Sequence, residues 1–80
     1  MDLTQYSQIK VTVLRRTFKA SEIIGYGHPE VGDLAWVIEV YQQPTLGYEL
    51  ECVDDYGLTK WMASVAPDDF EYEVIKRGYV

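Results

Sequence analysis

Residues 34–41 read Leu-Ala-Trp-Val-Ile-Glu-Val-Tyr, and residues 48–53 read Tyr-Glu-Leu-Glu-Cys-Val. In the second segment apolar residues alternate with Glu49 and Glu51, which is the pattern of a strand with one buried face. The first segment is β-branched, aromatic and almost wholly apolar, which predicts a central strand. Both phases of its alternation carry large side chains, so either both faces are covered or a bulge near Glu39 shifts the phase.

Three further strands are predicted around this pair, at residues 8–15, 58–64 and 70–75. Residues 16–32 contain three glycines and a proline, which predicts a long loop with one turn of helix at Ala20–Ile24. Residues 54–57, Asp-Asp-Tyr-Gly, fit a tight hairpin turn, because Asp opens such turns and Gly adopts a positive φ. Residues 66–69 predict a short turn of the 3-10 type.

Five short strands, a long first loop and tight later turns are typical of a small closed β-barrel, which also removes exposed sheet edges. An open sheet packed on a helix is the alternative, and only Phe18–Ile24 could supply that helix. Eighty residues are enough for one domain, so we expect residues 1–80 to form a single unit.

Composition indicates a globular protein of the cytoplasm. Apolar residues make up 48% of the chain and aromatic residues 14%. No uncharged stretch approaches the roughly 20 residues that span a bilayer, and the N-terminus lacks the basic and apolar regions of a signal peptide. Cys52 is the only cysteine, so no internal disulfide can form, which favours a reducing compartment.

The net charge of −6 is unevenly distributed along the chain. Residues 1–28 carry four basic and two acidic residues, whereas residues 29–80 carry three basic and eleven acidic ones. An acidic surface repels nucleic acid and anionic membranes and attracts basic partners. Nucleic-acid binding would depend on Lys10, Arg15, Arg16 and Lys19 alone. The alternative is that the acidic surface serves only solubility.

Residues 31–41 and 47–59 resemble a family of small bacterial proteins of uncharacterised function. The shared pattern is the Gly32-Asp33 pair, an apolar strand ending in Glu39-Val40-Tyr41, an acidic strand that begins Tyr-Glu, and a Gly turn. That family is similar to SH3-like barrels and to the immunity proteins encoded beside bacterial toxins. The resemblance covers about half of the chain. It implies a small five-stranded SH3-like barrel with a long first loop, and it implies no catalytic residue.

The residues that catalytic and metal sites require are sparse. His28 is the only histidine, and Cys52 is predicted to face the core, so a Cys–His pair is not expected. Glu49 and Glu51 have a spacing that could suit glycoside chemistry, but exposed strand positions offer no cleft to raise a pKa. The Asp pairs at 54–55 and 68–69 lack the alternate spacing of calcium ligands. We therefore expect no enzymatic activity, no cofactor and no metal site.

The acidic residues gather on the last three predicted strands and their turns, which are neighbours in a barrel. Nucleases are basic where they bind phosphate, so an acidic inhibitor can complement that surface. We expect an immunity or inhibitor protein that neutralises a basic toxin, with tyrosines as aromatic anchors. The predicted partner-binding residues are Tyr48, Glu49, Glu51, Asp54, Asp55, Tyr56, Asp68, Asp69 and Glu71. An accessory module of a larger complex and a phage-encoded inhibitor of a host defence nuclease are the alternatives.

Overall fold

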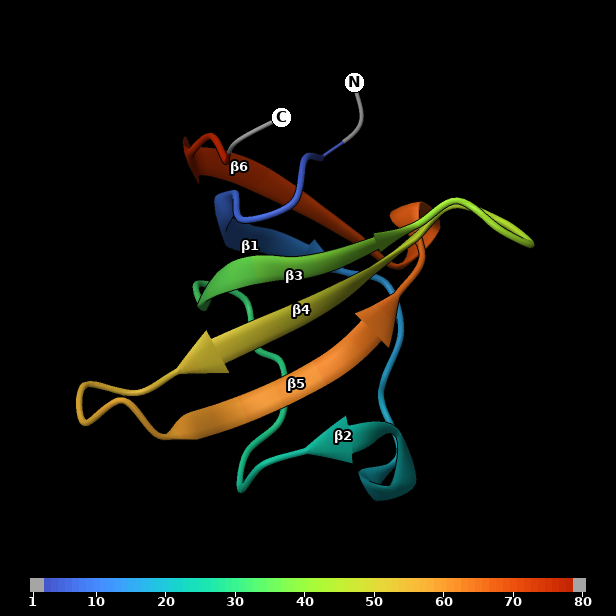
Figure 1. Ribbon diagram of the computed structural model, residues 1–80. Helices are drawn as coiled ribbons and strands as arrows, with labels where there is room; N and C mark the ends of the chain where they lie inside the picture. The colour runs from blue at the N-terminus through green and yellow to red at the C-terminus, as the bar shows by residue number, and fades with distance from the viewer. Residues whose placement is uncertain (1–2, 79–80) are drawn as a thin grey trace.

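The two segments that decide the fold are neighbours at the centre of an antiparallel sheet: β3 spans Leu34–Tyr41 and β4 spans Gly47–Val53. The computed structural model describes residues 3–78 (Figure 1). In this range the other strands are β1 (Gln8–Leu14), β2 (Ile23–Ile24), β5 (Thr59–Val65) and β6 (Phe70–Lys76). The strand order is β2-β5-β4-β3-β1-β6. Two 3-10 turns, η1 (Ala20–Glu22) and η2 (Pro67–Asp69), precede β2 and β6.

The prediction of an all-β fold is confirmed, but the sheet is not closed into a five-stranded barrel. In residues 3–78 the sheet has six strands, and β2 and β6 are its edges. The sixth strand, β2, lies in the segment expected to be loop, where Ile23 pairs with Ala63 and Ile24 pairs with Met62. Because β2 pairs with the edge of β5 that faces away from β4, that edge is not available to pair with β6 and close a five-stranded barrel. The expected helical turn is η1, and no described helix has the length and apolar character needed to cross a membrane.

A bulge in β3 explains why both phases of its sequence carry large residues. Val37 is opposite Leu50 and Glu39 is opposite Glu49, so Ile38 is the extra residue of β3. The bulge alternative is therefore confirmed. Val37 faces the core, and the shift brings two glutamates of adjacent strands directly opposite each other.

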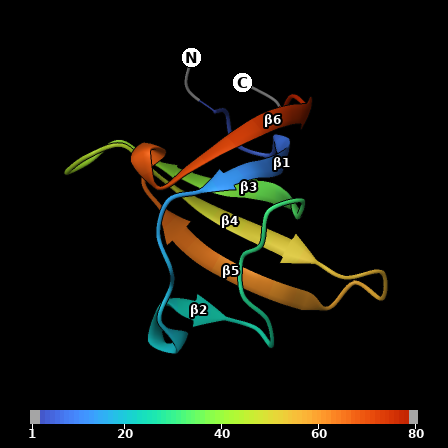
Figure 2. The ribbon, with the colours of Figure 1, turned by 180° about the vertical axis from the view of Figure 1, so that it is seen from behind.

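The core lies on one face of the sheet. On β4 the alternation is as predicted: Tyr48, Leu50 and Cys52 are buried, and Glu49 and Glu51 point away from them. The loop between β1 and β3 crosses this inner face, passing behind β4 and β5 in Figure 1 and in front of them in Figure 2. Of the two tryptophans, only Trp61 is buried in the core, at 1% exposure. Trp36 is half-buried on the opposite face.

The long loop is attached to the sheet near each end. At one end, Asp33 accepts a hydrogen bond from the Trp61 indole at 2.7 Å and pairs with the Lys60 ammonium at 3.0 Å. The backbone of β5 and the loop approach so closely that a Cβ on Gly25, whose φ is 119°, would lie 2.6 Å from the Lys60 carbonyl oxygen. At the other end, Phe18 packs against the core, and the Arg16 guanidinium pairs with Asp69 of η2 at 3.1 Å.

Candidate partner-binding surface

The face of β3, β4 and β5 opposite the core is not crossed by any described loop, and it faces the viewer in Figure 1. We call it the outer face. Strand alternation and the register of the strand pairs place on it Leu34, Trp36, Ile38, Glu39, Tyr41, Glu49, Glu51, Val53, Met62 and Ser64.

Two carboxylates of β4 are oriented on the outer face by hydroxyl groups of β5. The Ser64 hydroxyl donates a hydrogen bond to Glu49 Oε1 at 2.6 Å. The Thr59 hydroxyl donates to Glu51 Oε2, also at 2.6 Å. A neutral hydroxyl fixes the position of a carboxylate without cancelling its charge, so both side chains are held at defined places on the strand.

Glu39 and Tyr41 extend this acidic region onto β3. Glu39 lies directly across from Glu49, and Tyr41 is 44% exposed beside them. Partial burial and the carboxylates of Glu49 and Glu39 raise the pKa of Tyr41 above its usual value. The three side chains therefore share one electrostatic environment at this end of the outer face.

The ion pairs of the described residues leave this region uncompensated. Within residues 3–78 the salt bridges join Arg15, Arg16 and Lys60 to five carboxylates, which are Glu22, Glu30, Asp33, Asp69 and Glu71. None of them involves Glu39, Glu49 or Glu51. These three carboxylates therefore leave uncompensated negative charge on the outer face, which attracts cations.

The opposite end of the outer face is apolar. Trp36 lies across from Glu51 on one side, and Met62 lies across from it on the other. Leu34 and Val53, one outward position further along their strands, are 47% and 39% exposed. Glu51 is therefore the boundary between an acidic end and an apolar end of the outer face.

The structure brings only Glu49 and Glu51 of the nine predicted site residues onto this surface. Tyr48 is 2% exposed, because it is an inward position of β4, and its ring packs edge-on against Phe70 with 6.4 Å between ring centres. Its prediction as an exposed aromatic anchor is wrong for that reason.

Three predicted acidic residues have structural partners. Asp54 accepts hydrogen bonds from the Tyr26 hydroxyl and from two backbone N–H groups of its hairpin, and these bonds lower its pKa. Asp69 accepts the Ala66 N–H and pairs with Arg16, and Glu71 pairs with Arg15. Turn formation, which is the role expected for Asp54 and Asp69 from sequence, accounts for the hydrogen bonds that these two residues accept from backbone N–H groups.

The remaining predicted residues lie at two separate ends of the sheet. Asp55 and Tyr56, the latter 89% exposed, are at the tip of the β4–β5 hairpin, and Asp68 is in η2 beyond the far end of β5. Sequence reasoning missed Trp36 and Glu39 as members of the surface. The only available signal was the double phase of β3, which places large residues on both faces.

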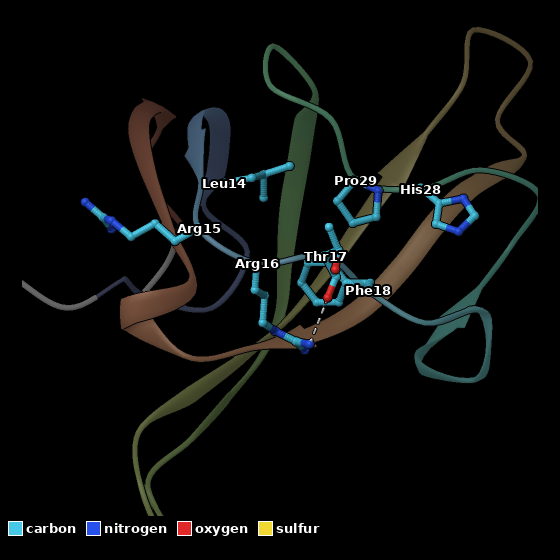
Figure 3. Close-up of a pocket in the computed structure, with 7 residues that line it drawn as sticks. All are labelled: Leu14, Arg15, Arg16, Thr17, Phe18, His28 and Pro29. Carbon is cyan, nitrogen blue, oxygen red and sulfur yellow. Dashed lines mark hydrogen bonds between the residues drawn. The ribbon is translucent and has the colours of Figure 1, made fainter.

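A hollow of about 600 Å³ lies on the other side of the molecule, between the end of β1 and the start and end of the long loop. Its lining combines Leu14, Phe18 and Pro29 with Arg15, Arg16, Thr17 and His28 (Figure 3). The Arg15 side chain extends away from the rest of the group in Figure 3, and both arginines are engaged with carboxylates. The hollow therefore has no uncompensated arginine charge.

Comparisons of the chain with models of known protein families, with curated protein sequences and with solved structures found no match. The resemblance of residues 31–41 and 47–59 to small bacterial proteins therefore stays a prediction.

Cys52 and His28, the two residues considered for a catalytic pair, lie in different environments. Cys52 is buried on β4, and burial raises the pKa of its thiol, which disfavours the reactive thiolate. His28 is exposed in the long loop. Within residues 3–78, no three His, Cys, Asp or Glu side chains are placed to hold a metal ion.

Proposed function

We propose that the protein is a non-enzymatic binding protein that inhibits a basic partner through its outer face. The partner we favour is a cognate toxin, most simply a nuclease, in the same cytoplasm. The observation that carries this proposal is the group of Glu39, Glu49 and Glu51, which no described base neutralises, beside the half-buried Trp36 and the exposed Tyr41.

The physical basis is charge complementarity around an aromatic and aliphatic centre. Uncompensated carboxylates accelerate the encounter with a basic surface and select against acidic partners. Large aromatic side chains supply most of the binding energy at the centre of such interfaces. The acidic end of the outer face provides the first property, and Trp36 with its apolar neighbours provides the second.

We propose further that the fold is an open variant of the SH3-like barrel. Its support is topological: the five expected strands occur in the order β5-β4-β3-β1-β6, a long loop follows the first of them, and a 3-10 turn precedes the last. The addition of β2 to β5 distinguishes this chain from a closed five-stranded barrel.

Affinity capture with matched baits tests the proposed function. The wild-type protein, the double variant Glu49→Lys/Glu51→Lys and the control Asp55→Lys/Asp68→Lys are used to capture partners from native cells at low and high salt. The two variants carry the same change of charge, but only the first alters the outer face. We expect a basic protein to bind the wild type and the control, to be lost with the first variant, and to dissociate as the salt rises.

Equal capture of that protein by both variants would refute the outer face as the binding surface. Capture of acidic subunits that resist high salt would instead favour an accessory module of a larger complex. When a basic partner is obtained, loss of its toxic activity on addition of the wild type, and not of Glu49→Lys/Glu51→Lys, would establish inhibition.

A further inference from the structure

We propose that the outer face recognises arginine side chains presented at alternate positions of an extended segment of the partner, followed by an apolar residue. This inference rests on the proposed function and specifies the chemistry of the basic partner. The segment lies along β4, whose successive outward positions are Glu49, Glu51 and Val53.

The site at Glu51 favours arginine over lysine. Trp36 is the cross-strand neighbour of Glu51, and Cβ atoms of such neighbours lie about 4.5–5.5 Å apart. The Thr59 hydroxyl fixes the carboxylate from the β5 side. A planar guanidinium can donate hydrogen bonds to a carboxylate while its face stacks on an adjacent indole, whereas an ammonium group is a point charge without such a face.

The site at Glu49 provides a second cation position. Glu39 lies directly across the strand, and no described base pairs with either carboxylate. A guanidinium placed between the Glu39 and Glu49 carboxylates relieves the repulsion of these two like charges and can donate hydrogen bonds to both of them. The Tyr41 ring is the neighbouring aromatic surface.

The spacing of these sites fits an extended ligand. Two residues of a strand span about 6.6–6.8 Å, and alternate side chains of any extended segment project to one side at this same interval. Arginines at two alternate positions therefore meet Glu49 and Glu51 together, and the next alternate residue meets the apolar end at Val53 and Leu34, which are 39% and 47% exposed. The ligand pattern is Arg-x-Arg-x-apolar, in either chain direction.

Short synthetic peptides test this pattern directly. The probes are the blocked peptide Gly-Arg-Thr-Arg-Thr-Leu-Gly, its reversed order, and the same two peptides with both arginines replaced by lysine. Binding to the whole protein is measured at low salt by amide chemical shifts and calorimetry. We expect at least one arginine peptide to bind about three- to tenfold more tightly than its lysine counterpart, because only arginine stacks on Trp36.

Three variants provide the controls. Trp36→Leu should remove the preference for arginine while leaving weak electrostatic binding, and Glu51→Gln should weaken the arginine peptide even if Trp36→Leu folds poorly. Glu73→Gln removes the same charge from β6, outside the outer face, and should leave peptide binding unchanged. Equal affinity for arginine and lysine peptides, or no peptide binding, overturns the inference. The proposed function fails separately, if capture of the basic partner does not depend on Glu49 and Glu51.

Discussion

Replacing Glu39 with Gln should make the protein more stable, although it removes a charge from the proposed binding surface. Glu39 and Glu49 face each other across β3 and β4, and neither is in a salt bridge in the described structure. Like charges directly opposite each other in a sheet are destabilising. The amide of Gln keeps the size of the side chain and removes the repulsion.

The magnitude follows from the cross-strand geometry. Two unit charges about 5 Å apart in water repel by roughly 0.8 kcal/mol, and long side chains that splay apart reduce this to about 0.3 kcal/mol at the least. For a domain of this size, each 1 kcal/mol changes Tm by about 4–8 °C. We therefore expect Glu39→Gln to raise Tm by about 1–6 °C in a buffer of low ionic strength.

Thermal and urea denaturation, followed by the fluorescence of the buried Trp61, measure this effect at about 10 mM and about 1 M salt. The Debye length falls from about 30 Å to about 3 Å between these conditions, so the gain should disappear at high salt. Glu73→Gln is the matched control, because Glu73 lies opposite Lys10 in the β1–β6 register. That variant should lose stability at low salt, where the wild-type pair attracts.

A variant Glu39→Gln that is no more stable than the wild type at low salt, or whose gain persists at high salt, would refute the electrostatic account of the outer face. A gain in stability together with weaker binding of the basic partner would indicate that the repulsion is retained for function.

Three further predictions concern the loop and the hairpin. Gly25→Ala should destabilise the protein more than Gly32→Ala, as measured by urea denaturation. Both glycines have a positive φ, but an added Cβ would meet backbone atoms only at Gly25. An added Cβ at Gly32 would have nothing within 4 Å of it. Asp33→Ala should lower the free energy of unfolding by about 1–3 kcal/mol, because it leaves the Trp61 indole N–H without its acceptor. Asp33→Asn should lower it by less, and similar losses for both variants would contradict this explanation. The hydrogen bonds to Asp54 lower the pKa of its carboxyl group from the ordinary value of 3.8. Their contribution to stability is complete above pH 3.8 and is lost as the pH falls through the lowered pKa of the folded state. The stability difference between Asp54→Asn and the wild type should therefore close at acidic pH, and a constant difference would count against the hydrogen bonds as its cause.

The sequence predicted the features that depend on local alternation. The strand at β4 and the hairpin turn at 54–57 follow from period-two patterns and turn chemistry, and the structure confirms them. For β3 the pattern left two alternatives, and the register shift next to Glu39 selects the bulge. The pairing of β2 with β5 could not be predicted in this way. Two isoleucines in a glycine-rich loop carry no alternation, and their pairing depends on where tertiary contacts such as Asp33 to Lys60 hold the loop.

The candidate surface shows the same division. Glu49 and Glu51 were identifiable because outward positions of an alternating strand carried charge. Tyr48 was misplaced as an anchor, although its own alternation puts it in the core. The neutralisation of Asp69 and Glu71 by Arg16 and Arg15 depends on contacts across more than fifty residues of sequence, which charge counting along the chain does not reveal.

The most direct test of the central claim is a map of amide chemical shifts in the isotope-labelled protein upon addition of its captured basic partner. The account predicts that the largest changes fall on the outward positions of β3, β4 and β5, with Trp36, Glu49 and Glu51 among them. Changes confined to the hollow at residues 14–18 and 28–29, or to the hairpin tip at 54–58, would contradict it.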